Sequence, residues 1–288
     1  MDDSAPFRWD LVTPDQLGSL LDGVDAPDLW FLDELVACTG KVVARGGNGD
    51  LVFVGRSLDS MYDLLGGALD GRVGLRRLPF SFARPVVRRG RRWRQRALTQ
   101  AEVAQARRMV QGVGAAPRDL ARGARPVTFV DVVSEGGTFT DLYTLLREWI
   151  DEEREPWPVI RRKLRFVGVT SRRQTSPNAY RWQQDDAPWT GELPARAVVN
   201  VSLDRQVWSY FGDDQTKLTR SFRPERWLAG ADGPDRGEQT RAALAEAVAL
   251  VHYGRSREGR RALARATAGE PALAEPWLRT LVTALSNG

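Results

Sequence analysis

The chain has 288 residues, of which 42% are hydrophobic and 27% are charged, and its formal net charge is +5. These values are typical of a globular protein with one or two domains, and no apolar run is long enough to predict a transmembrane helix. The single cysteine, Cys38, excludes an internal disulfide, and the single histidine, His252, argues against a His-based zinc site or Ser-His-Asp catalysis. The N-terminus lacks the pattern of a secretory signal, so we expect a cytoplasmic protein.

The first part of the chain predicts helices and one strand. An apolar pattern with helical spacing stops at Gly40, and we expect a helical N-terminal extension over residues 1–35. A glycine-rich turn then leads into a short apolar strand over residues 51–55. Residues 56–69 again have the apolar spacing of a helix, so a strand–loop–helix unit is predicted here.

An arginine-rich segment comes next. Residues 72–96 include ten arginines and no Asp or Glu, an asymmetry that indicates either an anionic partner or an exposed, mobile loop. Three interpretations stay open: a lid that closes over a substrate through Arg84, Arg88 and Arg89, a nucleic-acid-binding segment, and a solvated hairpin.

The rest of the chain alternates strands with helices. A capping box, formed by Thr99 and Glu102, predicts the start of the next helix. Further strands are predicted over residues 127–130, 164–171 and 197–203, and alanine-rich helices over residues 235–288. This alternation predicts an α/β domain over residues 36–230, with a mostly parallel sheet of about five strands flanked by helices. Ligands bind at the carboxyl ends of the strands in such sheets.

The turn in "DVVSEGGT" has the features of an anion-binding site. Backbone N–H groups in a turn, together with a helix N-terminus, attract anions, and Gly136 and Gly137 let the backbone approach a ligand closely. Ser134 and Thr138 can donate hydroxyl hydrogen bonds to a phosphate, whereas Asp131 is suited to sugar hydroxyls or a metal-bound water. The alternative is an ordinary turn in which Ser134 or Thr138 merely caps the following helix.

The stretch "FVDVVSEGGT" resembles the phosphoribosyl-diphosphate binding motif of the type I phosphoribosyltransferases. The resemblance implies transfer of ribosyl phosphate from 5-phosphoribosyl 1-diphosphate, with Mg²⁺, to an unidentified and planar small-molecule acceptor. It assigns Asp131 a catalytic role on the ribose hydroxyls and an indirect contact with Mg²⁺ through substrate or water. The residues that it assigns to the 5′-phosphate are Ser134, Glu135, Gly136, Gly137 and Thr138. Val130 stands where the family has the first of two acids.

Three other segments are similar to parts of that family by their position in the chain. Gly55, Arg56 and Ser57 would form the diphosphate loop, with Arg56 as a second catalytic residue. The arginine-rich segment lies where the family has its flexible catalytic loop. Trp208 and Tyr210, two residues apart, would stack on the acceptor if they lie in an extended loop, and the alternative is that both rings belong to the core.

Two other functions stay open. A regulatory protein could bind the sugar diphosphate without turnover, as the valine at position 130 suggests. A nucleic-acid-binding protein could use the arginine-rich segment, in which case its affinity should fall steeply with salt. No membrane partner is expected, and a homodimer is a further alternative.

Overall fold

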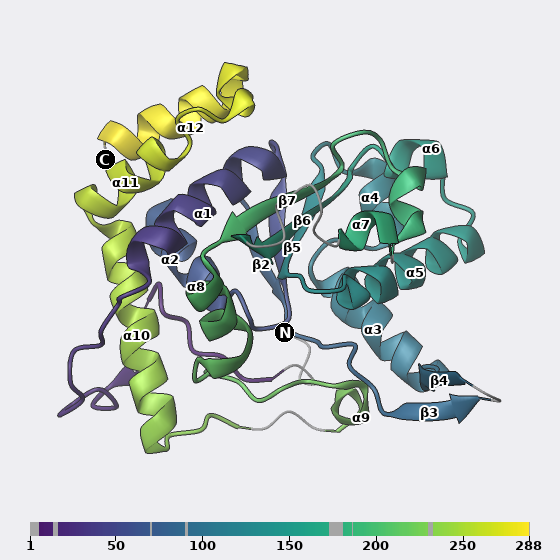
Figure 1. The fold of residues 1–288 in the computed structure, drawn as a ribbon, viewed down its shortest axis with the longest axis horizontal. Helices are drawn as coiled ribbons and strands as arrows, with labels where there is room; N and C mark the ends of the chain where they lie inside the picture. Colours follow the sequence, from purple (N-terminus) through teal and green to yellow (C-terminus); the bar gives the residue numbers. More distant parts are fainter. Residues whose placement is uncertain are drawn as a thin grey trace.

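A parallel β-sheet forms the centre of the computed structural model, which describes residues 6–13, 17–69, 71–89, 92–172, 181–185, 187–229 and 233–287. The sheet has five strands in the order β2-β1-β5-β6-β7 (Figure 1). The strands are β1 (Asp50–Val54), β2 (Leu75–Leu78), β5 (Val127–Val132), β6 (Leu164–Ser171) and β7 (Val198–Leu203). The predicted α/β fold with a parallel sheet of about five strands is confirmed.

Strand β2 is the one strand of this sheet that the sequence pattern did not predict. Its sequence lacks a continuous apolar run because Arg76 and Arg77 occupy its middle. The Arg77 side chain is only 11% exposed. It donates hydrogen bonds of 2.9 and 3.0 Å from Nε and Nη2 to the carboxylate of Asp59. A guanidinium with a bidentate acid partner can therefore take a strand position that usually holds an apolar residue.

Helices cover both faces of the sheet (Figure 1). One face is covered by α1 (Leu32–Gly46) and α2 (Asp59–Leu69), the other by α3 (Gln100–Gly112), α4 (Pro117–Arg122), α5 (Gly137–Glu152) and α6 (Trp157–Ile160). The predicted capping box at the start of α3 is confirmed. The Thr99 side chain accepts from the backbone N–H of Glu102, and the Glu102 carboxylate accepts from the backbone N–H of Thr99.

The helical part of the N-terminal region is α1 itself, and the described residues before it form turns and irregular segments. Helix α1 continues beyond Gly40, where the sequence pattern predicted its end. A Cβ atom at position 40 would lie 2.4 Å from the Cβ atom of Ala266 in α11 (Arg257–Ala266). Gly40 is therefore a point of close approach between two helices and not a helix end.

The C-terminal region is helical, as predicted, and its helices lie against α1 and α2 as an outer layer (Figure 1). Besides α11 it contains α10 (Glu238–Arg255) and α12 (Pro276–Asn287). Helix α10 contacts α2 closely, because a Cβ atom at Gly67 would lie 2.0 Å from the carbonyl oxygen of Val251. No helix in the described part of the chain has both the length and the apolar character needed to cross a membrane.

Shorter elements connect these layers. They are α7 (Trp182–Asp185), η3 (Pro188–Glu192), α8 (Arg205–Ser209), η4 (Tyr210–Asp214), α9 (Pro224–Trp227) and η5 (Pro271–Ala274). An antiparallel hairpin, β3 (Val86–Arg89) and β4 (Arg92–Gln95), is separate from the central sheet and projects from the body of the molecule near α3 (Figure 1).

Candidate functional site

The strand order of the sheet reverses between β1 and β5. The chain passes from β1 outward to β2 on one side, whereas β6 and β7 follow β5 on the other side. Phe53 pairs with Val130, so the next residues in register are Val54 and Asp131. Open α/β sheets bind ligands at such a switch point, beyond the carboxyl ends of the two strands. The structure therefore places the predicted diphosphate loop and the predicted phosphate turn at the same edge of the sheet, after neighbouring strands.

Asp131 is a buried acid at this edge of the sheet. It is 6% exposed, and its Oδ1 atom accepts a hydrogen bond of 2.7 Å from the backbone N–H of Val132. By strand alternation its side chain lies on the same face as Val133, in the apolar cluster that also contains Val54. Burial raises the pKa of Asp131 well above its ordinary value, and no cation among the described residues offsets this effect. A buried carboxyl group without a charged partner is a candidate for ligand binding.

The turn after β5 presents an uncapped helix N-terminus. Helix α5 begins at Gly137, and its N-cap is Gly136 in the left-handed conformation (φ +76°), with no side-chain hydrogen bond. The alternative that Ser134 or Thr138 caps the helix is therefore wrong. Ser134, Glu135 and Gly137 are exposed, and a Cβ atom at Gly137 would meet no atom within 4 Å. The backbone N–H groups of this helix start are thus accessible to an anion.

Trp182 lies against this turn. A Cβ atom at Gly136 would be 2.3 Å from Cε3 of the Trp182 indole. The indole Nε1 donates a hydrogen bond of 3.1 Å to Oδ1 of Asn200, and the ring is 2% exposed. Trp182 therefore belongs to the core and holds the turn from behind. The rings of Trp189 and Phe211 are also buried.

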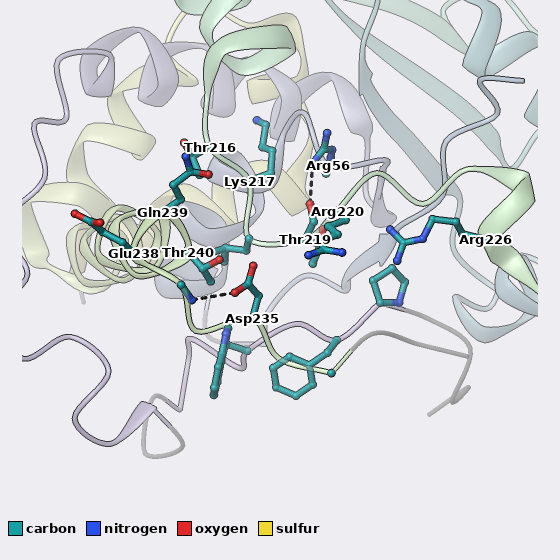
Figure 2. A pocket seen from close by; sticks show the side chains of 16 residues that line it. Arg56, Thr216, Lys217, Thr219, Arg220, Arg226, Asp235, Glu238, Gln239 and Thr240 are labelled. Atoms are coloured by element: carbon teal, nitrogen blue, oxygen red, sulfur yellow. Dashed lines mark hydrogen bonds between the residues drawn. The ribbon is translucent and has the colours of Figure 1, made fainter. Parts of the chain in front are cut away.

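The loop after β1 leads into a cleft of about 910 Å³ (Figure 2). Gly55 has a positive φ of +71°, and Arg56 is half-buried with its Nη1 atom donating 2.7 Å to the carbonyl oxygen of Thr219. Arg56 shares the cleft with Lys217, Arg220 and Arg226. Two acids, Asp235 and Glu238, also line this cleft, and its lining does not include the β5 turn.

Lys217 is the residue of this site that sequence reasoning missed. Its ammonium group donates 3.2 Å to the carbonyl oxygen of Ser57 and also donates to Gln215. Burial lowers the pKa of Lys217 to about 8, although the nearby carboxylate of Asp59 opposes the shift. One signal could have drawn attention to it, because Lys217 is one of only three lysines among 42 basic residues.

The lowered pKa of Lys217 predicts how stability depends on pH. The unfolded chain keeps this proton up to about pH 10.4, whereas the folded protein loses it near pH 8. Between those values the unfolded state binds more protons, so the free energy of unfolding should rise with pH. Urea unfolding at pH 7 to 9 should show this rise in the wild type and not in Lys217→Met. Lys163→Met is the control, since that amine also donates to a carbonyl oxygen (2.8 Å) and should leave the rise intact.

A buried charge network supports the start of α2, directly after the β1 loop. Asp59 and Asp63 both accept hydrogen bonds from Arg8, and Asp59 also accepts from Arg77. The backbone N–H of Asp59 donates 3.2 Å to the carbonyl oxygen of Arg56. The N-terminal segment that carries Arg8 therefore helps to fix the conformation of the predicted diphosphate loop.

The arginine-rich segment forms more ion pairs with the rest of the protein than its sequence suggested. Arg84 donates two hydrogen bonds of 3.0 Å to the carboxylate of Asp141 in α5. Arg96 donates to Glu102 and Glu225. Acids from outside the segment thus replace those that it lacks, and Arg84 is held against α5 in this structure. Arg88 in the β3–β4 hairpin is exposed, and the side chain of Arg89 lies outside the described structure. Closure of this segment over a ligand stays a prediction.

The predicted acceptor site at Trp208 and Tyr210 is not supported. The two residues lie in α8 and η4 and not in an extended loop, so residues two apart do not share a face. The Trp208 indole donates 3.0 Å to the carbonyl oxygen of Val169, and the Tyr210 hydroxyl donates 2.7 Å to Glu246. Both rings pack against the core on the α1 side of the sheet, Trp208 beside β6, the strand next to β5.

Magnesium would fit this site only together with a substrate. Among the residues that the structure describes, no group of three or more His, Cys, Asp or Glu side chains could hold a metal ion. Asp131 offers a single carboxyl group at the switch point. Mg²⁺ keeps several water ligands and commonly binds through one or two carboxylates plus substrate phosphates, so the donor set suits an ion that arrives with a phosphorylated ligand.

No protein-family model, no curated protein and no solved structure matches this chain. Its function must therefore be inferred from the switch point, from Asp131 and from the loops that follow β1 and β5.

Proposed function

We propose that the chain binds 5-phosphoribosyl 1-diphosphate at the switch point and transfers the ribosyl phosphate to a small-molecule acceptor, like the type I phosphoribosyltransferases. One observation carries the proposal. The neighbouring parallel strands β1 and β5 end, respectively, in the loop with Arg56 and in a buried acid that is followed by an uncapped helix N-terminus. An acid for sugar hydroxyls next to a backbone cradle for phosphate suits a phosphorylated sugar.

Each part of the site has a distinct role in this proposal. Asp131 accepts one hydrogen bond within the described protein, from the backbone N–H of Val132, and the ribose hydroxyls would donate further ones. The N–H groups at Gly137 and Thr138 and the hydroxyl of Ser134 bind the 5′-phosphate, with the dipole of α5 adding to the attraction. Glu135 is exposed and points its charge toward solvent or toward a hydrated cation.

In this proposal the diphosphate binds at the loop after β1. Arg56, Lys217 and Arg220 line the cleft there and would stabilise the charge that develops on the leaving diphosphate. Bound Mg²⁺ would supply further neutralisation of that charge. The acceptor is assigned to the same cleft, where the ring of Phe7 is 36% exposed and lies on the wall.

Binding without turnover is a second candidate, and one observation favours it. Val130 is fully buried on the face opposite to Asp131, in the apolar cluster beneath α1 and α2. An acid at that position would be buried without a partner, so this chain has one acid where the family has two.

A calorimetric titration with 5-phosphoribosyl 1-diphosphate, with and without Mg²⁺, tests both candidates. Diphosphate release in a screen of acceptors then separates an enzyme from a sensor, and absence of any binding would contradict both.

Gly137→Val is expected to abolish binding of the sugar diphosphate while leaving the fold intact. The new side chain enters open space, so the melting temperature should stay within a few degrees, but it covers the N–H groups that would hold the phosphate. Calorimetry and a melting curve measure the two effects. Gly112→Val is the matched control, because Gly112 also has open surroundings and an ordinary φ and lies at the end of α3. Unchanged affinity in Gly137→Val would place the phosphate elsewhere.

A further inference from the structure

A second cleft lies at the opposite, amino-terminal edge of the sheet. Its volume is about 1070 Å³, and it is bounded by the end of α1, by the starts of β6 and β7, and by the residues before and within the first turn of α12. The eight residues of β6 separate this edge from the carboxyl edge, a distance of roughly 25 Å at about 3.3 Å per residue. The two clefts have no lining residue in common.

Arginines from different elements converge on this amino-edge cleft. Arg45, at the end of α1, is satisfied by the protein: it donates to both carboxylate oxygens of Glu270 (2.8 and 2.9 Å) and to the carbonyl oxygen of Asn200 (2.7 Å). Arg162, Arg165 and Arg196 line the same cleft, and within the described residues none of the three has an acidic partner. Three guanidinium groups with free donors around one cavity are suited to a ligand with several anionic oxygens.

Arg196 holds a backbone conformation that is unfavourable for arginine. Its φ is +67°, and the backbone N–H of Ala197 donates 2.9 Å to the carbonyl oxygen of Pro194, which places Arg196 at the third position of a tight turn. Glycine or asparagine is the usual residue there, because a Cβ atom is strained in the left-handed region. No hydrogen bond or ion pair of the Arg196 side chain within the described protein offsets this strain. Such strain indicates that the side chain has a functional role, such as ligand binding.

The remaining walls of the cleft are suited to a flat ring. Trp277, in the first turn of α12, is partly buried and lines the cleft, as do the apolar residues Pro194 and Ala272. At the floor, Nδ2 of Asn200 donates 2.9 Å to Oε1 of Gln183, so these amides are fixed in orientation. A cavity of this size can enclose a small organic molecule of several hundred cubic ångströms.

We propose that the amino-edge cleft binds a nucleotide, with the phosphates on Arg162, Arg165 and Arg196 and the base against Trp277. The combination of three unpaired arginines and one indole in a single cavity favours this class over inorganic phosphate or an uncharged aromatic compound. The site does not depend on the function proposed for the carboxyl edge.

ATP, inorganic triphosphate and adenosine are suitable probes, measured by calorimetry at low salt on the whole chain. ATP should bind more tightly than either fragment, and Arg196→Gly should weaken ATP by about tenfold or more, the scale of one lost charge-assisted contact. The same variant should raise the melting temperature, because glycine relieves the strained turn. Arg154→Gly is the matched control: Arg154 is also exposed with a positive φ (56°), so its replacement should stabilise the protein without changing ATP affinity.

Trp277→Leu tests the contribution of the base to affinity separately from that of the phosphates. The variant should bind ATP more weakly and inorganic triphosphate equally well. Three results would overturn the proposal. The first is no ATP binding by the wild type at millimolar concentration, and the second is equal ATP affinity in the wild type and Arg196→Gly. The third is loss of ATP binding in Gly137→Val with retention in Arg196→Gly, which would place the nucleotide at the carboxyl edge.

Discussion

An Asp131→Asn variant is expected to be more stable than the wild type at pH 7 and to bind 5-phosphoribosyl 1-diphosphate at least about tenfold more weakly, the scale of one charge-assisted hydrogen bond. Both effects have the same origin. The carboxyl group is buried among apolar side chains, and the backbone N–H of Val132 is the hydrogen-bond donor that the described protein gives it. An asparagine has nearly the same shape, can accept the same hydrogen bond and never needs to carry a charge in that place.

The sign of the stability change follows from the pKa of Asp131. Burial raises this pKa in the folded state, whereas the unfolded chain releases the proton near pH 3.9. Above that pH the folded state binds more protons than the unfolded state, so stability falls as pH rises, by about 1.4 kcal/mol for each pH unit until the folded pKa is reached. The Asn variant lacks this loss. Its advantage should be present at pH 7 and should vanish near pH 3, where the acid is protonated in both states.

Urea unfolding of both proteins from pH 3 to pH 8, together with one calorimetric titration, tests this expectation. Asp213→Asn is the control, because Asp213 is exposed and its substitution should change neither quantity. Equal stability of the wild type and Asp131→Asn at every pH would mean that solvent reaches the carboxyl group. Higher stability with unchanged affinity would make Asp131 a buried acid without a role in the sugar site.

The regular elements of the domain could be predicted from local sequence. Four of the five sheet strands are short apolar runs, and the capping box at Thr99 and Glu102 defines the start of α3 within the sequence itself. The strand–turn–helix around Asp131 was likewise readable from consecutive residues. These features depend on residues that are close together in the chain, and their patterns can be recognised in a single sequence.

The features that were missed depend on residues distant in the chain. Arg77 can occupy β2 only because Asp59 from α2 accepts its hydrogen bonds. Arg84 is fixed by Asp141, which lies 57 residues further along the chain. Lys217 reaches the carbonyl oxygen of Ser57, 160 residues away, and no local pattern predicts such a contact. The positions of Trp208 and Tyr210 were misjudged for a simpler reason, because an extended loop was assumed where a helix follows β7.

The largest losses of stability are expected where the phosphate turn meets the core. Trp182→Ala should cost about 3–5 kcal/mol, the usual effect of removing a buried large aromatic side chain. Gly136→Ala should cost about 2–4 kcal/mol. About 1 kcal/mol of this arises from the left-handed backbone, and about 1–3 kcal/mol from the contact with the indole, since the new Cβ atom would lie 2.3 Å from Cε3 of Trp182.

A double-mutant cycle separates these two contributions. In the Trp182→Ala background the indole is absent, so Gly136→Ala should cost only about 1 kcal/mol, and the cycle should give a coupling of about 1–3 kcal/mol. Gly114→Ala is the matched control in the wild type, because Gly114 has a similar φ (+71°) with no atom within 4 Å of its added Cβ. It should show the backbone cost alone. Chemical denaturation of the four variants of the cycle and of this control provides all the values.

The coupling also decides how the anion site is built. If Gly136→Ala lowers the free energy of unfolding no more than Gly114→Ala does, the indole moves aside without a loss of stability and does not hold the turn. A large coupling means that Trp182 fixes the first N–H groups of α5 before any ligand arrives, and a site formed in advance loses less conformational freedom on binding. Trp182→Ala should then weaken the sugar diphosphate even though the indole faces the back of Gly136 and the core. Affinity equal to the wild type in a folded Trp182→Ala variant would show that the cradle does not depend on this support.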